Sequence, residues 1–337
     1  MKRLQVLVWH VHGNYLYYLG HVPHRFYVPV KEGRPTDYVG LSGGMPWPDN
    51  MTEVPADRVR ELDIDCVIFQ RPQQYFRESH LIMSKRQLAR AARIYLEHDP
   101  PQEHPTDCRH FVNDTRTLLV HVTPFNELMW DSGRTPTMVI DHGVVPIKGA
   151  SYTGEKDCGI CVVNNLGKRG RRLGRDVYLR ARRNVPLDLV GMGSEEIEGG
   201  LGEIGHDSLA SFESSYRFFF NPIRYTSLGL AVCEAMMLGM PIVGLATTEM
   251  ARVVENDISG YIDTDLSALM GRMRALIESP ALARRLGEQA REYALRRFNI
   301  QRFASEWDQA LRLVTGETVT TYSVVGQTRT ETIKEYV

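Results

Sequence analysis

Short apolar runs, each bounded by Gly, Pro or polar clusters, alternate with segments of helical periodicity along the chain. Such runs predict strands over 4–11, 25–30, 66–70, 93–97, 118–122 and 137–141, and, after a break, over 160–164, 187–190, 217–221 and 241–245. Helical patterns separate the later strands, over 174–184, 207–214 and 228–238. Unalternating strands joined through helices are typical of parallel sheets covered on both faces. The pattern therefore predicts an α/β fold with two successive series of strands.

Three amphipathic helices follow the second series of strands, over 266–277, 281–298 and 300–314. The stretch 142–157 is polar, contains Gly and Pro, and predicts a linker. We therefore expect an N-terminal domain over 1–148 and a C-terminal domain over 149–315, whose last helix can pack back on the first domain. A polar tail is expected over 316–337. A length of 337 residues is sufficient for two such cores.

Charge and composition narrow the classes of function. Lys and Arg total 40 against 41 Asp and Glu, so the net charge is −1 and no global positive field favours nucleic acid. No apolar run approaches the roughly 18 residues that cross a membrane, and the cysteines fit a reducing compartment. A cytoplasmic protein is expected. The basic helix within "QLARAARIYLEHDPP" leaves peripheral contact with an anionic membrane face open, although a solvated helix face is the simpler interpretation.

Two pairs of residues have side chains that often bind metals. Cys158 and Cys161 form a CxxC, but no second pair accompanies it, and residues three apart on a strand point to opposite faces. His10 and His12 are predicted to share one strand face, without an evident third ligand. Structural roles are therefore favoured over metal or redox chemistry for both pairs.

One acid, Glu234, lies within the apolar helix predicted in "FFFNPIRYTSLGLAVCEAMMLGMPIVG" (218–244). Thr226 and Ser227 are good N-cap residues for this helix, and Gly239 is a good C-terminal residue. Because an unpaired buried carboxylate is costly, Glu234 should either face a wet cleft or have a partner. A structural ion pair with an Arg remains the alternative to a ligand-binding role.

The start of the same helix favours phosphate. It offers unpaired backbone N–H groups at Ser227, Leu228 and Gly229, and glycine permits close approach of a ligand. Glu234 would lie about two turns, roughly 10 Å, further along the axis. The loop "NNLGKRGRRLGR" (164–175) follows a strand and carries five basic residues and three glycines. Such a loop suits a pyrophosphate, with a solvated basic turn as the alternative.

Other candidate contacts follow the carboxyl ends of predicted strands, where α/β domains bind ligands. These are His12-Gly13-Asn14, Gln70-Arg71, His98-Asp99 and His142-Gly143. His98 is expected to face the cleft from a loop stiffened by Pro, and a capped loop histidine is the alternative.

At this point the sequence resembles a known family. "SLGLAVCEAMMLGMPIVGLATTEMARVVENDISGYI", the basic loop and "VIDHGV" together resemble the retaining GT-B glycosyltransferases of the family-4 type, the glycosyl transferases group 1. The resemblance is strong over 160–300 and mainly topological over 1–150. It implies a GT-B fold, in which two Rossmann-like domains face each other across a cleft.

The resemblance also implies a function. A hexosyl or related sugar would pass from a nucleotide-sugar donor, held mainly by the second domain, to an acceptor such as a sugar or a lipid-linked molecule held by the first. Retention of configuration, no metal cofactor and a place in polysaccharide biosynthesis are expected. The implied catalytic residues are His98, Arg169, Arg172 and Glu234. The implied donor-binding residues are Gly13, Ile204, Thr226, Ser227, Leu228, Gly229 and Glu234, and the acceptor-binding residues are His12, Asn14 and Arg71.

The sequence departs from the family pattern at position 226, where an acid is usual and this chain has Thr226. Arg252 likewise stands where many members have Glu. Two alternatives therefore stay open: a non-catalytic nucleotide-sugar-binding GT-B subunit, and a nucleotide-sugar epimerase of the same fold. Donor, acceptor, linkage and oligomeric state are not determined by the sequence.

Overall fold

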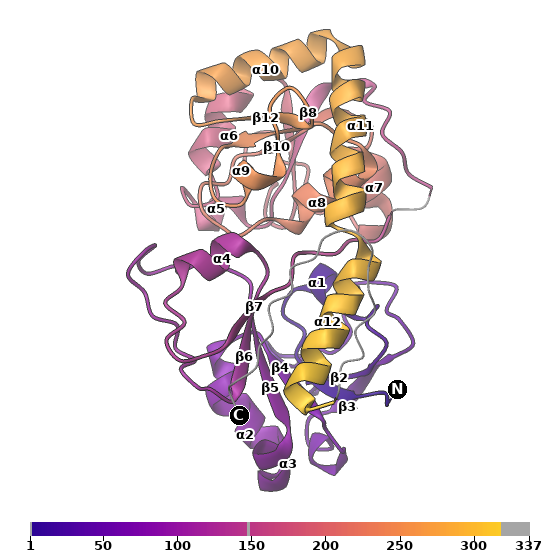
Figure 1. The fold of residues 1–337 in the computed structure, drawn as a ribbon. Coiled ribbons are helices and arrows are strands. Elements are labelled where there is room, and N and C mark those ends of the chain that lie inside the picture. The colour runs from indigo at the N-terminus through magenta and orange to yellow at the C-terminus, as the bar shows by residue number, and fades with distance from the viewer. Residues whose placement is uncertain (1, 147–148, 318–337) are drawn as a thin grey trace.

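Two parallel sheets organise the computed structural model, which describes residues 2–146 and 149–317 (Figure 1). The N-terminal sheet has seven strands in the order β3-β2-β1-β4-β5-β6-β7. Its strands are β1 (Gln5–Val8), β2 (Arg25–Val30), β3 (Met51–Pro55), β4 (Cys66–Phe69), β5 (Ala92–Glu97), β6 (Thr117–His121) and β7 (Thr137–Val139).

The C-terminal sheet has five strands in the order β12-β11-β10-β8-β9. They are β8 (Lys156–Val162), β9 (Leu187–Val190), β10 (Tyr216–Asn221), β11 (Ile242–Leu245) and β12 (Gly260–Asp263). In each sheet, successive strands are added first on one side of the first strand and then on its other side. The strand order therefore switches between β1 and β4 and between β8 and β10. Parallel sheets bind ligands outside the carboxyl ends of strands at such switch points.

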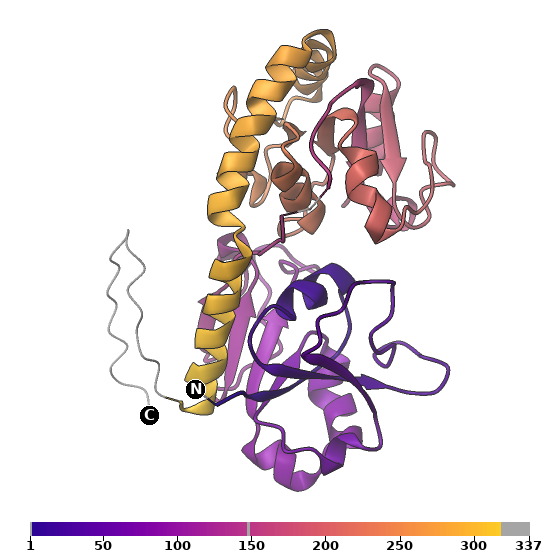
Figure 2. The ribbon, with the colours of Figure 1, turned by 90° about the vertical axis from the view of Figure 1, so that its right-hand side faces the viewer.

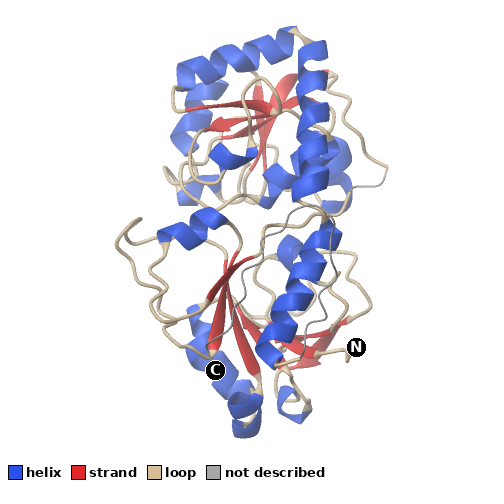
Figure 3. Ribbon diagram, viewed as in Figure 1, coloured by secondary structure: helices blue, strands red, loops and turns tan. Residues whose placement is uncertain are grey.

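Helices cover both sheets (Figure 3). In the N-terminal half these are α1 (Gly13–Leu19), η1 (Val59–Glu61), the π-helical turn η2 (Gln74–Glu78), α2 (Ser79–Ile82), α3 (Lys85–Arg90) and α4 (Pro124–Met129). The C-terminal half has α5 (Leu166–Arg169), α6 (Arg175–Arg182), α7 (His206–Glu213), α8 (Leu230–Leu238), α9 (Met250–Val253), α10 (Leu266–Glu278), α11 (Pro280–Arg297) and α12 (Ile300–Thr315).

The last two helices run along both halves of the molecule (Figure 2). Helix α11 packs on α8, and α12 continues onto the N-terminal domain beside α1 and β5. There the Trp307 indole N–H donates to the Tyr15 hydroxyl at 3.1 Å. Gly143 is required for this docking, because a Cβ at that position would lie 2.3 Å from the Cβ of Phe303.

Hydrophobic patterning located all ten predicted strands, with small errors at their ends. The strand predicted over 4–11 ends at Val8. The prediction was too long because Trp9 and Val11 are also apolar, although they pack in the core after the strand has ended. The linker predicted over 142–157 overlaps the start of β8, whose first residues, Lys156 and Asp157, are exposed and carry no apolar signal. Of the tail predicted over 316–337, only Gly316 and Glu317 belong to the described residues, and 318–337 lie outside them.

Several elements were missed, among them the edge strands β3 and β12 and the short helices α1, α2, α4, α5 and α9. Strand β3 mixes buried, intermediate and exposed positions, so it lacks the unbroken apolar run of the other strands. Helix α1 begins at Gly13, within a segment interpreted as a loop. The prediction that His10 and His12 share one strand face is therefore wrong, because both residues follow β1 and His12 is the N-cap residue of α1.

The start of α8 also corrects the sequence analysis. The helix begins at Leu230 with Gly229 as its N-cap, so Thr226 and Ser227 do not cap it. The Thr226 hydroxyl donates to Asp99 of the other domain instead. The amides of Ser227, Leu228 and Gly229 therefore belong to the loop before the helix, and Glu234 lies only about one turn inside α8. Gly239 ends the helix as predicted, with φ at 93°, a backbone conformation that favours glycine.

Candidate functional site

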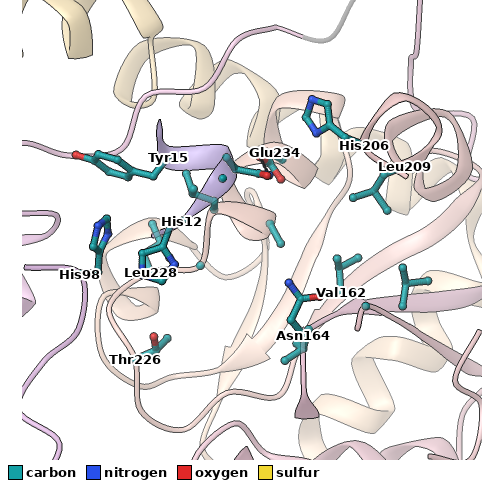
Figure 4. A pocket seen from close by; sticks show the side chains of 18 of the residues that line it. His12, Tyr15, His98, Val162, Asn164, His206, Leu209, Thr226, Leu228 and Glu234 are labelled. Carbon is teal, nitrogen blue, oxygen red and sulfur yellow. Dashed lines mark hydrogen bonds between the residues drawn. The ribbon is translucent and has the colours of Figure 1, made fainter. Parts of the chain in front are cut away.

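A cavity of 460 Å³ lies where the carboxyl ends of the two sheets meet (Figure 4). Both domains contribute to its wall. Of the residues singled out from the sequence, the following line it: His12, Gly13, Asn14, His98, Asp99, His142, Arg169, Ile204, Thr226, Ser227, Leu228, Gly229 and Glu234. Its size is within the range of small-molecule sites in proteins.

Arg71 and Arg172 are not among the residues that line the cavity. Arg71 lies beside Asp37, with Nη1 to Oδ1 at 3.4 Å. The carbonyl of Arg172 accepts the amides of Arg224 and Tyr225, at 3.0 and 3.3 Å.

Glu234 is only 8% exposed and is contacted from the opposite domain. Its Oε1 accepts hydrogen bonds from the Asn14 amide at 2.9 Å and from the Tyr18 hydroxyl at 2.8 Å. Burial and the nearby Glu234 charge raise the pKa of Tyr18 well above its ordinary value, so this hydroxyl stays a donor. No Arg or Lys of the described residues forms an ion pair with Glu234. Its second oxygen accepts no hydrogen bond from the described chain and is open to the cavity.

The loop before α8 is held on both sides. Thr226 Oγ1 donates to Asp99 Oδ1 at 3.2 Å, and the His142 Nε2–H donates to the Leu228 carbonyl at 2.8 Å. The Thr248 hydroxyl donates to the Ser227 carbonyl at 3.2 Å. Within 2–146 and 149–317 the amides of Ser227, Leu228 and Gly229 donate to no acceptor. The loop therefore presents ordered, unused N–H groups where an anion can bind.

Arg169 brings positive charge to this cavity. It stands at the end of α5, within the basic loop predicted from the sequence, and it lines the wall. Burial and the like charge of Arg172 lower its pKa, whereas the charge of Asp99 opposes that shift. No carboxylate among the described residues lies within ion-pair distance of Arg169 or Arg172. Two adjacent guanidinium groups without a carboxylate partner are suited to bind phosphate.

Three histidines stand at the N-terminal side of the cavity, and desolvation lowers the pKa of each of them. The pKa of His98 lies well below its ordinary value because of burial, with further lowering by His12 and His142. Burial also lowers the pKa of His12, and that of His142 to about 4. The rings of His12 and His98 meet edge to face at 4.3 Å.

The tautomer of His98 follows from its neighbours. Its Nε2–H donates to the Gln70 side-chain oxygen at 2.8 Å, because the Gln70 amide nitrogen already donates to the Trp9 carbonyl at 2.7 Å. The other ring nitrogen, Nδ1, is therefore an acceptor. A neutral imidazole with one free acceptor can receive a hydrogen bond from a ligand hydroxyl.

Some residues of the site were missed from the sequence. Asp99 was singled out only as the neighbour of His98, and Tyr18 not at all. Gly43 and Met45 reach the wall from the long β2–β3 loop, and Asn164 reaches it from the end of β8. The cluster of glycines with Ser and Pro in "GLSGGMP" was the signal for that loop, but its path depends on tertiary contacts such as the bond from the His10 ring to the Gly40 carbonyl at 2.7 Å.

A second interdomain network lies beside the site. Glu249 is fully buried and pairs with Arg297 at 2.5 Å and with Arg252 at 3.2 Å. Arg297 also pairs with Asp141, just before the linker, at 3.1 Å. The other oxygen of Glu249 accepts the backbone N–H of Phe125 in the N-terminal domain at 3.2 Å. These bonds fix the relative position of the two domains.

The cysteine pair agrees with the structural interpretation. Cys161 is buried in the core on one face of β8, whereas Cys158 packs against the core on the other face. No group of three or more His, Cys, Asp or Glu in the described part of the chain is arranged to hold a metal. Among the same residues no helix is both long and apolar enough to cross a membrane.

Comparisons with known proteins agree with this geometry. Residues 201–293 match the family model described as glycosyl transferases group 1, which supports sugar transfer. A search of curated protein sequences finds no match to the chain. Among solved structures, sucrose-phosphate synthase from Thermosynechococcus elongatus is 17% identical, with a TM-score of 0.68 over 93% of this chain and 100% of that one.

Two further structures have the same fold. Anabaena Alr3699/HepE, crystallised in complex with UDP, is 13% identical, with a TM-score of 0.68 over 93% of this chain and 100% of that one. AviGT4, a glycosyltransferase involved in avilamycin A biosynthesis, is 16% identical, with a TM-score of 0.62 over 93% of this chain and 98% of that one. The chain therefore has the GT-B glycosyltransferase fold, and its C-terminal domain carries the segment that characterises the glycosyl transferases group 1.

Proposed function

We propose that this protein transfers a sugar from a nucleotide-sugar donor to the hydroxyl of an acceptor. One observation carries the proposal. A single cavity contains the unused amides of 227–229, the unpaired guanidinium of Arg169 and a Glu234 oxygen free to accept a hydrogen bond. An anion site beside a hydroxyl-binding carboxylate suits a nucleoside diphosphate with its ribose.

The chemistry requires stabilisation of the leaving group. As the bond between the sugar carbon and the diphosphate oxygen breaks, its electron pair passes to that oxygen, and the acceptor oxygen forms the new bond and gives up its proton. Arg169, the nearby charge of Arg172 and the loop amides would stabilise the departing diphosphate. Preorganised donors are most effective where charge develops in the transition state.

The remaining roles follow from position in the cavity. Glu234 would bind the donor ribose and the backbone at Ile204 would contact the base. Gly13 and His98 approach the donor from the N-terminal side. His12 and Asn14 border the space left for an acceptor, although Asn14 already donates to Glu234. Arg71 would take part only if an acceptor drew it away from Asp37.

We further propose a UDP-hexose donor as the first to be tested, because HepE was crystallised with UDP and also with UDP and glucose. Retention of configuration is supported by the likeness of 227–262 to retaining enzymes. A metal-independent reaction is supported by the cationic side chain and loop amides, which can neutralise a diphosphate without a metal. The acceptor would be a sugar, lipid-linked or other hydroxyl-bearing molecule.

A ligand panel tests the proposal. Thermal shift and isothermal titration would use UDP, GDP, ADP and dTDP, each free and as the nucleotide-glucose or nucleotide-mannose. A ligand present at 100 times its dissociation constant should add about 2.7 kcal/mol to the free energy of unfolding. Absence of heat with all of them would contradict the proposal.

Turnover then separates the alternatives. Transfer to an acceptor that persists in EDTA, with the anomeric configuration kept in the NMR spectrum, is expected. His98→Ala should lower turnover more than nucleotide affinity. Conversion of donor incubated alone would indicate an epimerase. Tight binding without turnover on any acceptor would indicate a non-catalytic subunit.

A further inference from the structure

Asp99 holds a carboxylate at the boundary between the two domains. It follows His98 at the carboxyl end of β5 and lines the cavity. Its backbone is fixed on both sides, because its N–H donates to Glu97 Oε1 at 2.9 Å and its carbonyl accepts the Trp130 indole N–H at 2.9 Å. The position of this carboxylate is therefore set by the N-terminal domain.

Only one oxygen of the Asp99 side chain has a partner in the described chain. Oδ1 accepts the hydroxyl of Thr226 at 3.2 Å, which orients the carboxylate across the domain boundary. Oδ2 accepts no hydrogen bond from the residues described and is not enclosed by protein. A carboxylate has about four acceptor positions, so a half-used, half-buried one can bind ligand hydroxyls.

The neighbours of Asp99 indicate which part of a ligand would reach it. Thr226 is followed directly by the loop amides of 227–229, which we assign to the diphosphate. Arg169 is close enough for its pKa to respond to the Asp99 charge, but the two form no ion pair. In a nucleotide-sugar, the group joined to the diphosphate on the side away from the nucleoside is the sugar.

We propose that Asp99 binds hydroxyl groups of the donor sugar from the opposite domain, with Thr226 as the residue that positions it. This inference rests on the proposed function. It assigns a sugar-binding carboxylate that lies outside the C-terminal domain, where the nucleotide is held. The sugar would then connect the two domains, whereas the free nucleoside diphosphate would leave Asp99 without a ligand.

The proposal predicts a contrast between two ligands. The nucleotide-glucose or nucleotide-mannose that the wild type binds most tightly is compared with its free nucleoside diphosphate by isothermal titration. Asp99→Asn should weaken the nucleotide-sugar about tenfold and change the free diphosphate less than twofold. Thr226→Val keeps the carboxylate but removes its orienting hydroxyl, and should weaken the nucleotide-sugar only about threefold. Asp107→Asn, an exposed acid of the same loop, is the matched control and should leave both affinities unchanged.

Each other outcome decides against the proposal. Equal weakening of both ligands by Asp99→Asn, reproduced by Thr226→Val, would mean that the Asp99–Thr226 bond only joins the domains. Unchanged affinity for both would remove Asp99 from the site. In these cases the proposed function stands. A wild type that binds no nucleotide would instead overturn the proposed function together with this inference. Circular dichroism confirms that each variant is folded.

Discussion

At the scale of single residues, the carboxylate of Glu234 is held through one oxygen by two neutral donors, Asn14 and Tyr18. An ion pair with Arg was the alternative to a ligand-binding role, and none of the described cations takes that position. The cost of burying this charge is reduced by hydrogen bonds and by the open cavity beside Oε2. That arrangement leaves one strong acceptor for a ligand.

Glu234→Gln should therefore weaken nucleotide binding and leave the fold intact. The amide oxygen of Gln can still accept from Asn14 and Tyr18, whereas the charge toward the ligand is lost. A hydrogen bond to a charged group contributes about 1.5–3 kcal/mol, so we expect affinity for the nucleoside diphosphate to fall at least tenfold in titration calorimetry. Tyr18→Phe, which keeps the carboxylate, should have a smaller effect. A lower melting temperature with unchanged affinity would instead identify Glu234 as structural.

His142 makes the free energy of unfolding depend on pH. Its pKa is lowered from 6.5 to about 4, chiefly by burial. The unfolded chain therefore takes up a proton between pH 6.5 and 4 that the folded residue does not, and the stability present above pH 6.5 is lost as the pH falls through this window. His98, whose pKa is also lowered by burial, adds to the same loss.

The contribution of His142 can be isolated with His142→Gln. A Gln amide can still donate to the Leu228 carbonyl but does not titrate. In urea unfolding at several pH values, the free energy of unfolding of this variant should fall less steeply between pH 6.5 and 4 than that of the wild type. Parallel curves for the two proteins would show that His142 does not carry this dependence.

At the scale of elements, the short helix α5 and the loop before α8 lie together at the cavity, where we propose that the diphosphate binds. Both lie at carboxyl ends of strands, β8 and β10, on either side of the switch point of the sheet. The sequence located this region correctly, but Thr226 and Ser227 led to a start of α8 that was too early. Local capping preference favoured them, whereas the bond from Thr226 to Asp99 directs this loop away from a helix.

Arg169→Ala should weaken nucleotide binding more than Arg172→Ala, because Arg169 lines the cavity and Arg172 does not. Both effects should be larger at low salt, where contacts to phosphate are least screened. Arg175→Ala, at the exposed end of the same basic loop, is the control and should change affinity little. Titrations in about 20 mM and about 300 mM salt would measure this difference, because the Debye length shortens severalfold between the two concentrations. An equal loss for all three variants would indicate only a general effect of charge.

At the scale of the whole molecule, buried ion pairs join the two domains around the cavity. Glu249 and Arg297 lie in the C-terminal half, yet they contact Phe125 and Asp141 of the N-terminal half. Charge pairs and hydrogen bonds of this kind restrain the opening of the cavity more specifically than apolar contact would, since each requires a defined geometry. Helix α12 adds the apolar part of the same connection.

Arg297→Gln should destabilise the protein by at most about 3–5 kcal/mol, the usual cost of breaking a buried ion pair, because Arg252 and the Phe125 amide still contact Glu249 in the variant. The free energy of unfolding should recover in part in the double variant with Glu249→Gln, because the buried charge is then removed as well. Arg296→Gln, its exposed neighbour on α11, is the control and should be neutral. A loss in Arg297→Gln no greater than in the control would show that the network contributes little.

The sequence by itself determined the two parallel sheets, the end of α8 at Gly239, and the positions of the basic loop and of the loop before α8 at the carboxyl ends of strands. These features depend on periodicity, glycine conformation and charge within short stretches of chain, which a sequence displays directly. The tertiary structure alone decided the partners of Glu234 and Thr226, the neutral state of His98, and the positions of Arg71 and Arg172 outside the cavity wall. Each of these depends on how two separately folded domains meet, and the residues that meet there are far apart in the sequence, so no local pattern encodes their contact.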